Sequence, residues 1–244
     1  MTSNATAALD RPAAFEPRPL GTVFVTGGTS GLGAAVAAAV ASAGGTPGVL
    51  DRLPPSDGTP FAAVDLADSA ATAAAVDDLV ARVGPPSAVV TAAGTDACGP
   101  LADLAPEAWE RVVRVNLFGT VAVIRACLPH LRAARGTVVT VASTLGLRGV
   151  SDATAYCASK FAVRGFTHAL AAELAGQVGV TLLIPGGMRT AFFDGRSEQY
   201  KPGPDADLAD PNDVAAAVLI ALRQPVGTEI REMLVMSSRE TSWP

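Results

Sequence analysis

Short apolar runs alternate along the chain with longer segments in which apolar residues recur at helical spacing. Most of the short runs contain no alternating polar positions, which is typical of strands buried on both faces of a parallel sheet. The sequence predicts seven such strands, GTVFVT (21–26), PGVLD (47–51), PFAAVD (60–65), SAVVTAAG (87–94), GTVVTVAS (136–143), GVTLLIPG (179–186) and EMLVMS (232–237).

The longer segments predict helices, because several begin with residues that favour helix N-termini, such as Ser30, Asp68 and Pro106. We expect helices over residues 31–43, 70–82, from 106 onward, 155–175 and 211–223. Alternating strands and helices predict an α/β fold, a doubly wound and mostly parallel seven-stranded sheet with helices on both faces. Its ligand should bind beyond the carboxyl ends of the strands.

One connection differs from the others. Residues 52–64, RLPPSDGTPFAAV, are short and rich in Pro, Gly and polar side chains. A helical crossover usually needs about a dozen residues or more, so we expect a loop with little or no helix, and an open flank of the sheet there.

Composition limits the classes of partner. The 244 residues are 49% hydrophobic and 17% charged, with a net charge of -5 and with Lys and Arg scattered, so a small molecule is favoured over nucleic acid or an anionic membrane. We expect a flexible tail over residues 1–19 and one domain over 20–244. No apolar run reaches membrane-spanning length, which favours a cytoplasmic protein. Three cysteines without paired spacing favour reduced thiols and no metal site.

A glycine-rich segment, TGGTSGLG (26–33), lies between the first strand and the first helix. Gly27, Gly31 and Gly33 allow a tight turn and a close approach of the backbone to a diphosphate, which the helix N-terminus attracts. Asp51 ends the second strand, close to the ~20-residue offset at which a carboxylate binds an adenosine ribose. The carboxylate favours NAD(H), because it repels a 2'-phosphate, whereas Arg52 could pair with that phosphate and leaves NADP(H) open.

A phenol and an ammonium group stand four residues apart in AYCASKFAV (155–163), on one face of a predicted helix. Hydride transfer at an alcohol carbon requires a group that moves a proton on the oxygen, and Tyr156 is a candidate. A cation within roughly 4 to 6 Å lowers the pKa of a phenol by about 1 to 3 units, so we expect Lys160 to lower the pKa of Tyr156. Ser143, at the end of the fifth strand, is placed to stabilise charge on the substrate oxygen.

Taken in order, these motifs resemble the short-chain dehydrogenase/reductase family from Gly21 almost to the C-terminus. TGGTSGLG fits the Thr-Gly-x-x-x-Gly-x-Gly loop of that family, AYCASK fits its Tyr-x-x-x-Lys, and PGGMRT (185–190) fits its Pro-Gly loop after the sixth strand. Ser143 and Asn116 lie where the family has its other catalytic groups. In place of the usual Asn-Asn-Ala-Gly the chain has TAAG (91–94), which removes an Asn that braces the sheet and puts local stability in doubt.

The resemblance implies a single-domain Rossmann fold and a role for each matching residue. The catalytic residues would be Asn116, Ser143, Tyr156 and Lys160, with Asn116 holding a water that links Lys160 to solvent. Asp65 would contact the adenine, and Thr190 with the backbone of Met188 would hold the carboxamide. The cofactor-binding residues would be Gly27, Thr29, Ser30, Gly31, Leu32, Gly33, Asp51, Arg52, Asp65, Leu66, Ala92, Ala93, Gly94, Tyr156, Lys160, Pro185, Gly186, Met188 and Thr190.

The expected activity is NAD(P)-dependent hydride transfer between nicotinamide and a secondary alcohol or ketone. Residues 190–211 are long and polar enough for a lid over the substrate. Their aromatic and basic side chains favour a cyclic oxygenated substrate that is sugar-like, nucleoside-like or polyketide-derived. Two alternatives are an epimerase or lyase that uses the cofactor transiently, and a non-catalytic dinucleotide-sensing protein.

Assembly is also expected. Ala158, Ala162, Gly165 and Ala169 form a stripe of small residues at helical spacing, which lets another helix approach closely. With the helix pairing that the resemblance implies, and with the C-terminal RETSWP (239–244) reaching across a second interface, the sequence predicts a homodimer or homotetramer.

Overall fold

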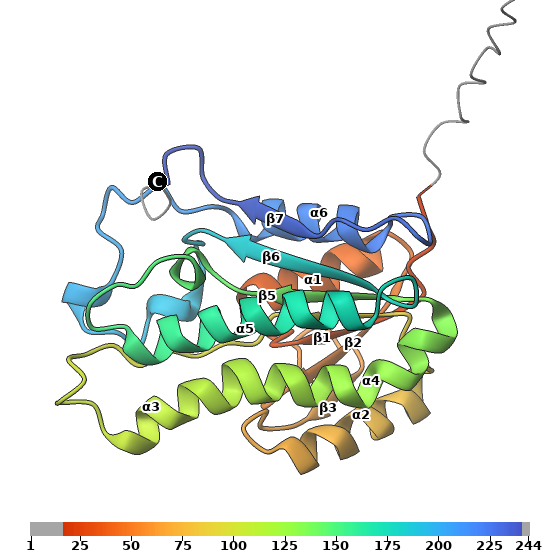
Figure 1. Cartoon of the computed structure of the whole chain (residues 1–244), viewed down its shortest axis with the longest axis horizontal. Coiled ribbons are helices and arrows are strands. Elements are labelled where there is room, and N and C mark those ends of the chain that lie inside the picture. Colours follow the sequence, from red (N-terminus) through yellow and green to blue (C-terminus); the bar gives the residue numbers. More distant parts are fainter. Residues whose placement is uncertain (1–16, 241–244) are drawn as a thin grey trace, which may run out of the picture.

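The computed structural model of the chain describes residues 17–240, and its centre is one seven-stranded sheet (Figure 1). All strand pairs are parallel, in the order β3-β2-β1-β4-β5-β6-β7. The order reverses between β1 and β4, which is where a doubly wound sheet offers a crevice for a ligand. The predicted fold is therefore confirmed.

The strands and helices lie close to the expected ranges. The strands are β1 (Thr22–Thr26), β2 (Thr46–Asp51), β3 (Phe61–Ala63), β4 (Ala88–Thr91), β5 (Thr137–Val141), β6 (Gly179–Pro185) and β7 (Glu232–Val235). The helices are α1 (Gly31–Ser42), α2 (Ser69–Val83), α3 (Pro106–Val113), α4 (Thr120–Ala134), α5 (Thr154–Glu173) and α6 (Pro211–Leu222). No helix joins β2 to β3, as the composition of that connection predicts.

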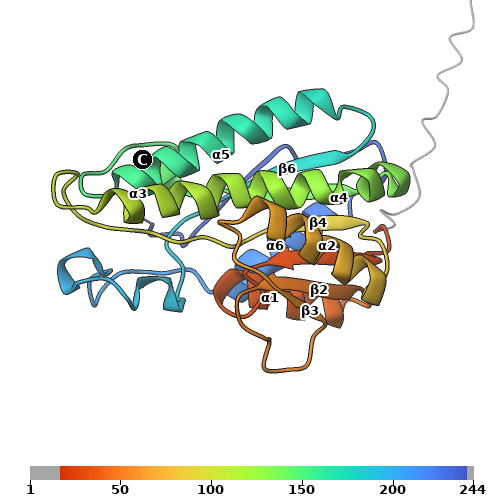
Figure 2. The same ribbon diagram turned by 90° about the horizontal axis from the view of Figure 1, so that it is seen from below.

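Apolar side chains fill both sides of the sheet. Phe24 of β1 belongs to a cluster with residues of α2, α4 and α5, which cover one face, while its neighbour Val25 packs with residues of α1 and α6 on the other (Figure 2). Successive residues of a strand point to opposite faces, so a strand between two helical layers is buried on both faces and favours apolar residues, with a few buried threonines such as Thr140 and Thr181. This explains why the strands read as continuous apolar runs.

The connection between β4 and β5 is one long helical segment in which a π-helical stretch, Arg114–Gly119, separates α3 from α4. Among the described residues, Pro106–Ala134 is the one helix long and apolar enough to cross a membrane by length and composition, although the sequence shows no such continuous run. Its residues Ile124 and Leu131 are buried in the core beside the sheet. Packing against the sheet accounts for part of that apolar character, since 39% of the apolar window is buried.

Two details bear on the boundary of the expected tail and on the segment TAAG. Residues 1–16 lie outside the described part, but Arg18, assigned to the tail, donates to the backbone oxygens of Ala134 and Arg135, each at 2.7 Å. At the end of β1, the hydroxyl of Thr26 accepts from the backbone N–H of Ala93 at 3.0 Å. This bond ties β1 to the end of β4 without an Asn, whereas the buried Thr91 hydroxyl has no hydrogen-bond partner among the described residues.

Candidate functional site

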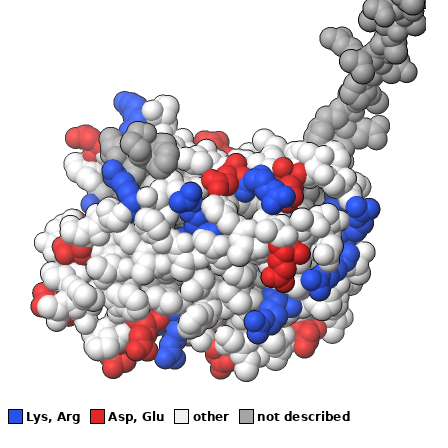
Figure 3. Space-filling model, viewed as in Figure 1, with Lys and Arg blue, Asp and Glu red and all other residues white. Residues whose placement is uncertain are grey.

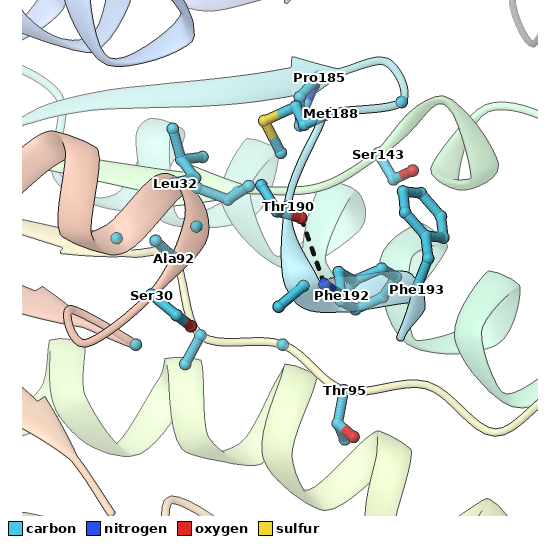
Figure 4. A pocket seen from close by; sticks show the side chains of 18 of the residues that line it. Ser30, Leu32, Ala92, Thr95, Ser143, Pro185, Met188, Thr190, Phe192 and Phe193 are labelled. Carbon is cyan, nitrogen blue, oxygen red and sulfur yellow. Dashed lines mark hydrogen bonds between the residues drawn. The ribbon is translucent and has the colours of Figure 1, made fainter. Parts of the chain in front are cut away.

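A cavity of about 1020 Å³ lies at the carboxyl ends of the strands, at the β1/β4 switch point. Every residue predicted to contact the cofactor lines it. Of the four residues predicted to be catalytic, Ser143, Tyr156 and Lys160 line the cavity and Asn116 lies behind its wall. Figure 4 shows Ser30, Leu32 and Ala92 on one side of the cavity, and Ser143 with Phe192 and Phe193 on the other.

The glycine loop is packed so closely that side chains cannot enter it. A Cβ on Gly27 would lie 2.8 Å from Cα of Ala93, and a Cβ on Gly33 would lie 2.1 Å from the backbone oxygen of Gly27. Gly27 also has a φ of +70°, which L residues with side chains rarely adopt. The loop therefore brings the backbone and the first turn of α1 to the cavity, and this arrangement suits the diphosphate of a dinucleotide.

Two carboxylates mark the opposite end of the cavity from Tyr156. Asp51, at the end of β2, accepts from the Thr29 backbone N–H at 3.1 Å and the Thr29 hydroxyl at 2.6 Å. Asp65 accepts from the backbone N–H of Ala67 and from Arg111 Nη2, and the Ala67 bond is the first cause of its lowered pKa. Thr29 thus holds Asp51 at the rim of the cavity beside the glycine loop.

The catalytic pair is close, but its electrostatics differ from the expectation. Lys160 Nζ lies 5.5 Å from the centre of the Tyr156 ring and donates to the Val141 oxygen at 2.9 Å. Burial raises the pKa of Tyr156 to about 12, and the hydrogen bond with Ser143 acts in the opposite direction. Burial lowers the pKa of Lys160 to about 8. The expected lowering of the Tyr156 pKa is therefore wrong for this state of the site, because burial disfavours both charged forms.

Asn116 lies in the π-helical stretch between α3 and α4, a type of irregularity frequent at functional sites. Its Oδ1 accepts from the backbone N–H of Thr95 at 2.8 Å, and its Nδ2 donates to the Thr95 oxygen and to Ser159 Oγ. Both amide hydrogens are thereby used within the protein. Any water held by the side chain of Asn116 must bind to the remaining lone pair of Oδ1.

The sequence reasoning missed Thr95 and Ser159 as partners of Asn116. Ser159 accepts from Asn116 and donates to the backbone oxygen of Tyr156 at 2.8 Å. A signal for Ser159 was available, since a serine in a buried helix needs a partner for its hydroxyl. Thr95 contributes backbone atoms, which no sequence pattern reveals.

The predicted lid begins at Thr190 and contains two short 3-10 turns, Ala191–Phe193 and Glu198–Tyr200. A parallel bridge joins Met188, just before the lid, to Ala209, near its end, and so brings the two ends of the lid together. The hydroxyl of Thr190 accepts from the backbone N–H of Phe192 (Figure 4), and the Phe192 ring lies 5.6 Å from the Tyr156 ring. The lid thus covers the end of the cavity where the catalytic pair lies.

The C-terminal segment also reaches the cavity. The Glu240 carboxylate accepts from the backbone N–H of Gly187 at 2.7 Å, and Arg239 pairs with Asp207 at the end of the lid. Residues 241–244, the rest of the segment expected at a second interface, lie outside the described residues. On the face drawn in Figure 3, acidic and basic side chains are interspersed around a broad uncharged area.

Comparisons with known proteins agree with this geometry. The sequence model of the family described as short chain dehydrogenase matches residues 21–201. A 2-dehydro-3-deoxy-L-rhamnonate dehydrogenase (NAD(+)) of Sphingomonas sp. (strain SKA58) is 36% identical over 182 residues, which are 70% of this chain and 73% of the relative. A D-threitol dehydrogenase of Mycolicibacterium smegmatis (strain ATCC 700084 / mc(2)155) is 32% identical over 216 residues, 80% of this chain and 83% of that protein.

Among solved structures, a variant of actinorhodin polyketide ketoreductase with NADPH is similar over 88% of this chain and 95% of its own, with a TM-score of 0.77 and 28% identity. Both NAD and NADP thus occur among the names of the similar proteins. The comparisons support a nicotinamide dinucleotide as the cofactor and do not choose between the two.

Proposed function

Since the chain belongs to the short chain dehydrogenase family, and is thereby an NAD(P)-dependent oxidoreductase, we propose that it interconverts a secondary alcohol and a ketone with Tyr156 as the general acid and base. One observation carries the proposal. Ser143, Tyr156 and Lys160 converge at one end of a cavity that reaches the glycine loop and the first turn of α1. That arrangement accommodates an extended dinucleotide between the glycine loop and the catalytic pair.

We propose the following roles for this chain's residues. When bound, the nicotinamide supplies a hydride to the ketone or accepts one from the alcohol. Tyr156 donates its proton to the substrate oxygen in reduction and accepts it in oxidation. Ser143 hydrogen-bonds the same oxygen and stabilises the charge that develops there. Lys160 Nζ lies 5.5 Å from the centre of the Tyr156 ring, and as a cation it would favour the phenolate whenever it carries its proton.

The proposed substrate is a cyclic oxygenated molecule that is sugar-like, nucleoside-like or polyketide-derived. Phe192 and Phe193 line the substrate end of the cavity, and the Arg196 guanidinium, which also lines it, lies against both rings. The names of the similar proteins include a sugar acid and a polyol, which are open-chain, and a polyketide, so they support the oxygenated character of the substrate and not its ring. Polar oxygen groups on a ring would suit both the aromatic surface and the guanidinium.

The test uses the only two tyrosines of the chain, Tyr156 and Tyr200. Ketones and alcohols of the three proposed classes are assayed with NADH, NADPH, NAD+ and NADP+, by the absorbance of the reduced cofactor. We expect Tyr156→Phe to lower kcat/KM by roughly 10²- to 10⁴-fold without loss of NADH binding, since it removes the proton donor. Tyr200→Phe, the matched control, should stay within a few-fold of wild type.

Three results would contradict the proposal. A Tyr156→Phe enzyme that binds NADH and turns over normally would exclude Tyr156 as the acid and base. Product formed without net change in reduced cofactor would indicate an epimerase or lyase. Dinucleotide binding without turnover across the panel would favour a sensing protein.

A further inference from the structure

The lid is tied to the body of the protein by a buried ion pair. Arg196 Nη2 lies 2.7 Å from Asp96 Oδ2, and the two side chains are 18% and 7% exposed. Among the ion pairs of residues 17–240 this is the most buried, whereas the pair formed within the lid, Lys201 with Glu198, faces solvent at 33% and 87% exposure. Asp96 follows β4, so the pair joins segments that lie far apart in the sequence.

Arg196 also contacts the aromatic rings of the lid. Its guanidinium carbon lies 4.9 Å from the centre of the Phe192 ring and 4.7 Å from that of Phe193. Since the Phe192 ring lies 5.6 Å from the Tyr156 ring, a continuous series of contacts leads from Asp96 through Arg196 and Phe192 to the catalytic phenol. Figure 4 shows Phe192 and Phe193 on the side of the cavity where Ser143 lies.

Both oxygens of the Asp96 carboxylate accept hydrogen bonds. Besides Arg196, it accepts from the Cys98 thiol at 3.2 Å and from the Ala97 backbone N–H at 2.7 Å. A buried ion pair contributes little net stability, but removal of one partner leaves an unpaired buried charge and is strongly unfavourable. Such a pair therefore holds one geometry of the lid far more firmly than it stabilises the protein.

We propose that Asp96 and Arg196 are positioning residues, whose ion pair holds the lid closed over the cavity and holds Phe192 against the ring of Tyr156. The inference rests on the proposed role of Tyr156. Its test needs neither substrate nor turnover, so failure of the lid proposal can be told apart from failure of the proposed role of Tyr156.

Burial lowers the pKa of Lys160 to about 8, and under this proposal the closed lid contributes to that burial. The groups that face the catalytic pair are Asp96, Arg196, Ser143 and Cys157. If Asp96 acted by its charge alone, Asp96→Asn would lower the Lys160 pKa further, since the carboxylate raises it. If the ion pair closes the lid, the same substitution admits water and raises the Lys160 pKa toward 10.5. The two accounts predict opposite signs.

Lys160 and Lys201 are the only lysines, so the protein labelled with ¹³C at the lysine ε-carbons gives two resonances, assigned with Lys201→Arg. We expect the pH midpoint at which the Lys160 resonance titrates to rise in Asp96→Asn and Arg196→Gln. In Arg196→Lys, which keeps the cation, this midpoint should return most of the way to the wild-type value. Glu198→Gln breaks the exposed pair of the same lid and should leave the midpoint unchanged.

Hydrogen exchange of the lid amides, residues 191–208, gives the second readout. We expect exchange on the order of tenfold faster or more in Asp96→Asn and Arg196→Gln, and unchanged in Glu198→Gln. A fall of the Lys160 midpoint in Asp96→Asn, or unchanged lid exchange in both variants, would overturn the proposal. If Asp96→Asn does not fold, the exchange measurement on Arg196→Gln decides.

Discussion

At the scale of single residues, Tyr156 and Lys160 are the most informative positions. Four-residue spacing correctly predicts that they share a face of α5, but Lys160 is only 4% exposed, and its ammonium group has Val141 as its acceptor. Burial disfavours the charged form of each group, so their pKa values move in opposite directions. Below about pH 8 the phenol stays protonated beside a cation, and between about pH 8 and 12 both groups are neutral.

The lowered pKa of Lys160 has a consequence for stability. The unfolded chain binds the lysine proton up to about pH 10.5 and the folded chain only up to about 8, so stability rises with pH between these values. We expect the unfolding free energy of wild type to gain roughly 3 kcal/mol relative to Lys160→Met between pH 8 and 10.5.

Urea unfolding of both proteins across that range, with NADH absent, provides the measurement. Lys201→Arg serves as the control and should follow wild type, since Lys201 lies in the exposed pair of the lid. If the difference in unfolding free energy between wild type and Lys160→Met stayed constant from pH 8 to 10.5, the lowered pKa of Lys160 would be refuted.

At the scale of elements, hydrogen bonds join the end of β2 to the loop before α1. The Asp51 carboxylate is bound by Thr29 of that loop, while Arg52, whose backbone N–H also donates to Asp51, lies next in sequence. A fixed carboxylate at the cavity rim suits ribose hydroxyls and repels a 2'-phosphate.

We therefore expect NADH to bind more tightly than NADPH, and Asp51→Ser to shift that ratio toward NADPH by about tenfold or more. Fluorescence titration of both cofactors measures the ratio without a substrate. Asp57→Asn, an exposed carboxylate in the same connection, should leave the ratio unchanged. A clear NADPH preference in wild type would contradict the assignment of Asp51 to the ribose.

At the scale of the whole molecule, α5 and the long helix beside it leave apolar side chains exposed. Phe118 and Phe161 are 52% and 43% exposed, and Gly165 faces open space, since a Cβ there would meet nothing within 4 Å. The view in Figure 3 shows a broad area without charges on this side of the molecule. These features support the proposed pairing of two copies through α5.

Gly165→Glu tests this pairing, because within one chain the new side chain has room and glutamate favours a helix more than glycine does. We expect light scattering to give a dimer or tetramer for wild type and a smaller species for the variant. Gly149→Glu, also in open space but in a loop, should keep the wild-type mass. A wild-type mass equal to one chain would exclude the assembly.

By itself, the sequence determined the order of strands and helices, the glycine loop and the tyrosine–lysine pair. These features follow from periodicity and local spacing, which act between neighbouring residues. Only the tertiary structure decided the partners of Asn116, the ion pair between Asp96 and Arg196, and the directions of the Tyr156 and Lys160 pKa shifts. Those depend on burial and on contacts between residues far apart in the chain, because packing, and not spacing, sets the local dielectric.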